Sequence, residues 1–181
     1  MIKQLIVNNE YIVSTVKSGL IVINANRALK RITYDKIFNS LDKNDINSQQ
    51  LLFPTKLFID NEGLTLLKIN ENFLNKLGFI IVFEATSIII TGIPNFIEIS
   101  NISEIIDLII DIFKGKDKTN IYENIIKGIL NIKGNINLKN SNEAKSLVNN
   151  LFRSSENIYD PFGKRIFIIL DSCNLDNILN S

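Results

Sequence analysis

Strand-like apolar segments at both ends of the chain constrain the fold more than any other feature. Residues 5–7, 11–13 and 20–23 are runs of Leu, Ile, Val and Tyr, and residues 165–170 form one more such run near the C-terminus. Gly19 stands where a tight hairpin needs a left-handed residue. We therefore predict one sheet that both chain ends complete. Because the runs are almost continuously apolar, much of both faces of this sheet should be covered.

The middle of the chain has the spacing of helices. Apolar residues predict helices at 25–41, 62–77, 102–113, 121–132 and 143–152, a hairpin of 79–83 with 87–91, a strand at 57–59 and a short final helix at 174–179. Gly78 occupies the position of a C-terminal helix cap. Asn101, with Glu104 three residues later, predicts a capping box.

This order of elements indicates an α+β fold with two subdomains. Both chain ends would form a sheet-based subdomain, and a mostly helical subdomain would be inserted between them. We place the first subdomain at residues 1–49 and 155–181 and the second at residues 50–154. A polar loop is predicted for residues 42–50.

Composition excludes several chemistries. The 181 residues include no His and one Cys, so a His-based catalytic triad, a disulfide framework and a Cys/His zinc site cannot be built within one chain. With 20 basic and 19 acidic residues the net charge is +1, so any contact with nucleic acid must be local. The apolar runs are too short to cross a bilayer, and residues 1–4 are not typical of a signal peptide. We predict no membrane association, no cofactor and, from the single Cys, a reducing cytoplasmic location.

Two motif-like features are more typical of ordinary surface structure. Gly115 and Lys116 lack the spacing of a phosphate-binding loop, which favours a solvated loop. Glu104, Asp107 and Asp111 share one face of a predicted helix whose opposite face is apolar. That pattern favours a solvated helix face over a metal site.

Residues 49–54, Gln-Gln-Leu-Leu-Phe-Pro, change abruptly from polar to apolar. A Gln followed by apolar residues suits an extended peptide bound in a hydrophobic groove, where the Gln fixes the register and the apolar side chains fill pockets. The same pattern also suits the beginning of a core strand. The residues by themselves leave these two interpretations equally open.

The order of these pieces resembles the C-terminal domain family of the MutL DNA mismatch repair proteins. The resemblance covers nearly the whole chain and rests on Tyr11-Ile12 with residues 19–23, Arg-Ile-Thr-Tyr-Asp at 31–35, Leu-Leu-Phe-Pro at 51–54, Leu-Gly-Phe at 77–79 and Gly-Ile-Pro at 92–94. It implies a homodimerisation module in which the chain ends form the dimerisation subdomain and the insertion is regulatory.

Many members of that family carry a nicking endonuclease with the motif D-Q-H-A-x-x-E-x-x-x-x-E. In this chain Asn24 takes the place of the first Asp, Asn26 that of the His, and Lys30 that of the first Glu. Asp35 alone keeps an acid. A lysine would repel a divalent metal, and one carboxylate holds such an ion poorly.

The family's second motif, C-P-H-G-R-P, aligns with residues 160–165, where Asp160 and Phe162 replace the Cys and the His. A third, Cys-containing motif would fall near residues 128–133, which hold no Cys. The chain therefore resembles the branch of the family that lacks the nuclease motif, and we predict neither a bound metal nor catalysis.

The family also carries a peptide that binds the DNA polymerase sliding clamp at the position of residues 49–54. This resemblance favours a clamp contact, with the residues Gln49, Leu51, Leu52, Phe53 and Pro54.

The leading hypothesis is a homodimerisation and scaffold domain of a MutL-like protein that holds two ATPase halves together. Its implied partners are the sliding clamp, the mismatch-recognition protein MutS and a DNA helicase or separate nicking endonuclease, with weak DNA contact at most. One rival is a divergent metal-dependent nicking endonuclease that uses Asp35. Another is an unrelated α+β binding domain that does not form an obligate dimer.

Overall fold

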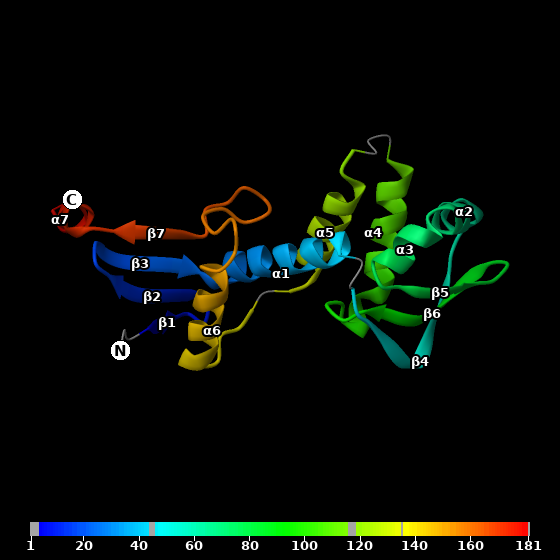
Figure 1. The fold of residues 1–181 in the computed structure, drawn as a ribbon, viewed down its shortest axis with the longest axis horizontal. Coiled ribbons are helices and arrows are strands. Elements are labelled where there is room, and N and C mark those ends of the chain that lie inside the picture. Colours follow the sequence, from blue (N-terminus) through cyan, green and yellow to red (C-terminus); the bar gives the residue numbers. More distant parts are fainter. Residues whose placement is uncertain (1–3, 44–45, 116–118, 135, 181) are drawn as a thin grey trace. The chain divides into compact units, whose positions relative to one another are not determined.

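The fold is drawn from a computed structural model that describes residues 4–43, 46–115, 119–134 and 136–180 (Figure 1). It mixes helices and sheets, as the predicted α+β class requires. Within the described part of the chain, no helix is both long and apolar enough to cross a membrane.

The chain divides into two compact units. Unit 1 comprises Met1–Asp35 and Gly134–Ser181, and unit 2 comprises Lys36–Lys133. The predicted boundaries after residues 49 and 154 lie further along the chain. They differ because the strand that includes residue 49 pairs within unit 2, whereas residues 138–151 pack in the core of unit 1.

The sheet of unit 1 joins strands from both ends of the chain. All its neighbouring strands are antiparallel, in the order β1 (Leu5–Val7), β2 (Tyr11–Val16), β3 (Gly19–Asn24) and β7 (Phe167–Leu170). β7 covers less than the predicted strand, since Arg165 forms an isolated bridge with Tyr159 instead.

Gly19 forms the β2–β3 hairpin for two reasons. Its φ of +144° lies in the region that favours glycine, as predicted. A Cβ atom at this position would also lie 2.1 Å from the carbonyl oxygen of Leu170. The close approach of β7 could not be read from the hairpin sequence.

The described residues of unit 1 also form the helices α1 (Ala25–Asp42, which continues into unit 2), α6 (Ser141–Leu151) and α7 (Ser172–Leu179). The Asn24 side chain accepts a hydrogen bond from the N–H of Arg27 at 3.0 Å, which satisfies one amide at the start of α1. One face of the sheet packs against α1 and α6 through the buried residues Ile12, Ile21, Ile23, Ala25, Ala28, Leu138, Ala144, Leu147, Leu151 and Ile166.

Unit 2 contains a second antiparallel sheet in the order β4 (Ser48–Phe58), β6 (Ser87–Pro94) and β5 (Ile80–Phe83). The predicted β5–β6 hairpin is confirmed. The loop predicted to continue to Gln50 is wrong at its end, because β4 begins at Ser48. The register of β4 shifts between Gln50 and Thr55, where Pro54 has no N–H to donate to a ladder.

The helices of unit 2 are α2 (Asn61–Ile69), α3 (Glu71–Lys76), α4 (Ile102–Lys114) and α5 (Ile121–Ile132). The single helix predicted for 62–77 is wrong, because it breaks at Asn70. There the backbone N–H and the side-chain Nδ2 of Asn70 both donate to the carbonyl of Leu66. Gly78, at φ +91°, ends α3 as predicted, with its N–H bonded to the Asn75 carbonyl.

The core of unit 2 lies between its sheet and its helices. The main contribution of α4 is an unbroken apolar face of Ile102, Ile105, Ile106, Ile109, Ile110 and Phe113. The predicted capping box at Asn101 is wrong, since its side chain makes no cap hydrogen bond. A 3-10 turn, Ile99–Asn101, leads directly into α4 and gives Asn101 a turn conformation.

Candidate functional site

The sheet of unit 1 has one face that the described part of the chain leaves open. Paired residues of an antiparallel sheet lie on the same face, so the strand register assigns each side chain. The open face consists of Leu5, Val7, Tyr11, Val13, Thr15, Leu20, Val22, Asn24, Ile168 and Leu170. Except for Thr15 and Asn24, every member is apolar or aromatic.

Exposure shows how little covers this open face. Leu5 is 56% exposed, Ile168 44% and Val7 43%. An antiparallel sheet with one solvated face normally alternates apolar and polar residues, which this sheet does not. The prediction that much of both faces is covered therefore fails within the described part of the chain. The missing alternation is the sequence signal of a face that needs a partner.

Positions that align with the first two nuclease motifs also come together in unit 1. Lys30, on α1, places its ammonium 5.0 Å from the centre of the Phe162 ring. Nearby, Arg27 Nη1 donates to the carbonyl oxygen of Arg165 at 2.7 Å. The cation and the aromatic ring thus stand where the family motifs have a Glu and a His.

The side chains of Asn26 and Asp160 accept hydrogen bonds from backbone N–H groups. The Oδ1 atom of Asn26 accepts a hydrogen bond from the N–H of Ile136 at 2.5 Å. Asp160 is buried, and its Oδ1 accepts from the N–H groups of Phe162 and Lys164 at 2.9 and 2.8 Å. These hydrogen bonds fix the turn that carries Phe162.

Asp35, the one acid that the first motif keeps, forms an ion pair with Arg31 one turn earlier on α1. Both side chains are largely buried. Among the described residues, no three His, Cys, Asp or Glu side chains gather as a metal site would need. The third motif position, residues 128–133, lies in α5 and just after it, in unit 2.

Residues 49–54 divide between the core and solvent. Gln49 pairs with Ile93 in the sheet, and Leu51 is buried in the core of unit 2. In contrast, Leu52 is 93% exposed and Phe53 is 86% exposed. The interpretation as the beginning of a core strand therefore fits Gln49 and Leu51, and the interpretation as a groove-binding peptide fits Leu52 and Phe53.

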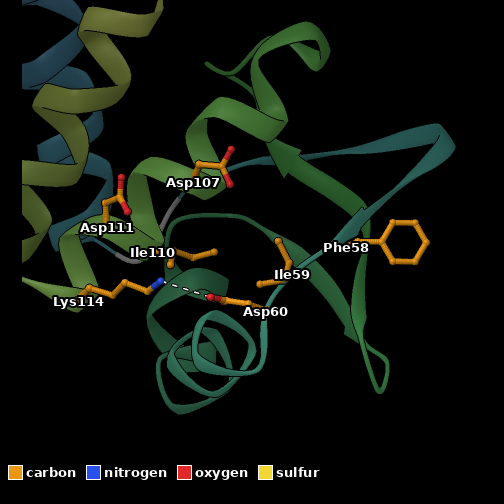
Figure 2. A pocket seen from close by; sticks show the side chains of 7 residues that line it. All are labelled: Phe58, Ile59, Asp60, Asp107, Ile110, Asp111 and Lys114. Atoms are coloured by element: carbon orange, nitrogen blue, oxygen red, sulfur yellow. Dashed lines mark ion pairs between the residues drawn. The ribbon is translucent and has the colours of Figure 1, made fainter.

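Unit 2 also contains a small open pocket of about 270 Å³ between β4 and α4. Figure 2 shows Asp107, Ile110, Asp111 and Lys114 of α4 along it, facing Ile59 and Asp60, while Phe58 points away. Asp107 and Asp111 are exposed, in accord with the solvated helix face predicted for them.

The polar groups at this pocket cap α2 and connect it to the last turn of α4. Asp60 caps α2 by accepting from the N–H of Gly63 at 2.7 Å. Lys114 Nζ lies 3.5 Å from Asp60 and 3.4 Å from Glu62. Lost hydration acts to lower the pKa of Lys114, but the hydrogen bond with Glu62 and the two negative charges outweigh it, so the pKa lies above its ordinary value.

Comparisons with known proteins agree on one family. The family model described as the MutL C terminal dimerisation domain matches residues 4–132. The chain belongs to this family. DNA mismatch repair proteins MutL from Christiangramia forsetii and Flavobacterium psychrophilum are each 30% identical to it, and that of Flavobacterium johnsoniae is 32% identical.

These three alignments cover 94% of this chain but only 27–29% of each relative. The chain therefore corresponds to somewhat more than a quarter of a MutL protein. Family membership excludes the third hypothesis, an unrelated α+β domain.

Proposed function

We propose that this chain is a homodimerisation domain and that two copies join through the open face of unit 1. The observation that supports this proposal most directly is the apolar sheet face, on which Leu5, Val7 and Ile168 are each at least 43% exposed. Covering such a face with its own copy buries apolar area from both partners, and a two-fold axis makes the surface complementary to itself. The match to a dimerisation family supports a second copy as the occupant.

The test is the mass of the chain in solution. We expect sedimentation equilibrium at micromolar concentration to give twice the 20.6 kDa chain mass. Ile168→Asp should give the monomer mass, since it places a charge in the interface. Val82→Asp is a matched control because Val82, which is 51% exposed, lies on the sheet of unit 2. A monomeric parent protein would contradict the proposal.

We further propose that the domain has no nicking activity. The contact of Lys30 with Phe162, the buried turn of Asp160 and the ion pair of Asp35 support this, because a divalent metal needs several free oxygen or nitrogen ligands. The rival is a divergent metal-dependent endonuclease. Manganese-dependent nicking of supercoiled plasmid that disappears in Asp35→Asn would establish the rival.

Clamp docking is the second proposed role. Leu52 and Phe53 offer exposed apolar side chains, and each could contribute roughly 1.5–3 kcal/mol if fully buried. Gln49, which is exposed, and Pro54 would complete the peptide. Leu51 would have to leave the core, so we assign the pocket to Leu52 or Phe53. Because the peptide is short, we expect micromolar or weaker affinity.

Phe53→Ala and Gln49→Ala should reduce binding to the cognate sliding clamp without changing the melting temperature. Phe58→Ala is the matched control, since Phe58 is 78% exposed on the same strand. The clamp proposal fails if Phe53→Ala binds like the parent protein, or if the parent protein does not bind at all.

The role in a complete protein follows from the relatives. We infer that the domain holds two ATPase halves together in mismatch repair and meets MutS, a helicase or a separate nicking endonuclease. We also infer a cytoplasmic location, for which the exposed and free thiol of Cys173 is suitable.

A further inference from the structure

The segment with the exposed pair Leu52 and Phe53 forms a long bulge of β4. Gln50 pairs with Gly92 and Thr55 pairs with Ile90, so the four β4 residues 51–54 lie opposite one β6 residue, number 91. A bulge leaves its extra residues without partners in the ladder and redirects their side chains. Residues 51–54 are therefore a short peptide that begins and ends in the same sheet.

Both flanks of the bulge are attached to the rest of unit 2. Before it, the hydroxyl of Ser48 donates to the carbonyl oxygen of Gly78 at 2.7 Å. After it, the ammonium of Lys56 lies 2.6 Å from the carboxylate of Glu84. A segment that is fixed at both ends loses less conformational freedom on binding than a free peptide does.

Within the bulge, one side chain is buried and the next two are exposed. Leu51 belongs to the core of unit 2, whereas Leu52 and Phe53 are almost entirely accessible to solvent. Pro54 follows them, and its ring fixes its own φ and restricts the backbone of Phe53. The exposed pair thus lies between a buried anchor and a stiff residue.

We propose that Leu51 is a positioning residue for the clamp contact. Burial of its side chain holds the bulge in the shape that keeps Leu52 and Phe53 outside, so the clamp meets an apolar pair that is already in place. Such placement raises affinity because the pair is ordered during folding, before the partner arrives. The positioning role rests on the proposed clamp docking.

The sequence pattern instead assigns Leu51 to the contact itself, together with Leu52 and Phe53. For that contact Leu51 would have to leave the core, and the cavity left behind would destabilise unit 2. Burial therefore favours the positioning role. The two roles differ in one measurable respect: a direct contact also matters in a free peptide, whereas an anchor in the core matters only in the folded domain.

The test compares the whole chain with a synthetic peptide of residues 48–55 for binding to the cognate DNA polymerase sliding clamp. Each is prepared with the parent sequence and with Leu51→Ala, and affinities are measured by surface plasmon resonance well below the melting temperatures of the variants. Leu67→Ala is the matched control, since Leu67 is fully buried in the same core but lies on α2. Leu51→Met, which keeps the apolar volume, tests for rescue.

We expect the parent chain to bind at least about tenfold more tightly than the parent peptide. Leu51→Ala should remove most of this advantage in the chain and change the affinity of the peptide by less than about twofold. Leu67→Ala and Leu51→Met should bind like the parent chain. Where Leu51→Ala does not fold, Leu51→Val replaces it and should give a smaller loss, again in the chain alone.

The positioning role can fail while clamp docking holds. Equal affinities of the parent chain and the parent peptide, equal losses for Leu51→Ala in both, or an equal loss for Leu67→Ala would each overturn it. If neither the chain nor the peptide binds the clamp, clamp docking is wrong and the positioning role is wrong with it.

Discussion

The two sheets of this protein differ in whether their exposed faces carry charged residues. The sheet of unit 2 places charges among its exposed apolar residues: Lys56 forms an ion pair with Glu84 at 2.6 Å across the strands, and Ser87 donates to Glu84. The open face of unit 1 carries no charged residue between Leu5 and Leu170. A solvated sheet interrupts its apolar area with charges, whereas a sheet without them indicates a protein partner.

The largest effect we expect is in the core of unit 2, which needs no partner to be complete. Ile106 is fully buried, and Ile106→Ala should lower the free energy of unfolding of unit 2 by about 3–4 kcal/mol, since it leaves a cavity. Hydrogen exchange with mass spectrometry should show faster exchange in α4 and α5, and this effect should not depend on protein concentration.

Ile12→Ala is the counterpart in unit 1, where Ile12 is also fully buried. Because dimerisation would stabilise unit 1, protection of β2 and β3 should increase with protein concentration in this variant. If both units respond to concentration in the same way, the distinction between a complete and an incomplete unit is wrong.

Gly19→Ala tests how tightly β7 closes the sheet of unit 1. The positive φ and the 2.1 Å approach to the Leu170 carbonyl should together cost about 2–3 kcal/mol, measured as the shift of the urea midpoint. Gly163→Ala separates the two causes, because Gly163 has a positive φ but open space around it. It should cost about 1 kcal/mol, and equal losses would rule out a tight approach of β7.

Lys30→Met tests the contact that replaces the metal-ligand position in unit 1. Loss of the cation over Phe162 should cost about 0.5–1 kcal/mol in urea unfolding. Lys30→Arg keeps a cation over the ring and should recover most of this stability. No difference between the two variants would show that the contact does not stabilise the turn.

The smallest effect concerns the charges on the outer face of unit 2. The pKa of Glu84 lies below its ordinary value, because Lys56 and Ser87 donate hydrogen bonds to it and the charge of Lys56 adds to them, while partial burial opposes. A carboxyl with a lowered pKa stabilises the fold above its unfolded pKa and loses that stability as the pH falls through the folded value. Thermal melts of Glu84→Gln should therefore depend less on pH below about pH 4.5 than those of the parent protein.

The opposite sign applies to Lys114, whose pKa is raised by Glu62 and Asp60. Its contribution is fully present below the unfolded pKa and is lost as the pH rises through the folded value. Lys114→Met should lower the melting temperature at neutral pH, where the contribution of Lys114 is fully present, and weaken the dependence on pH in the alkaline range. An alkaline limb that is as steep as that of the parent protein would contradict this assignment.

The local sequence pattern was sufficient to predict much of the fold. The Ile spacing of α4 and α5 gave helices close to their true limits, because residues three and four apart share a face in any helix. Gly19 and Gly78 marked a hairpin and a helix end, because few other residues adopt a positive φ. The membership of both chain ends in one sheet followed from their strand-like composition and was confirmed.

The tertiary structure alone decided the features that involve distant residues. Lys30 and Phe162 are far apart in sequence, and only the packing of the 160–165 loop against α1 brings cation and ring together. Leu51, Leu52 and Phe53 are similar in sequence, yet the register shift in β4 buries the first and exposes the other two. A sequence determines which residues are apolar and how they repeat, but burial depends on what the opposing element covers. For the open face of unit 1, the described residues supply no such element.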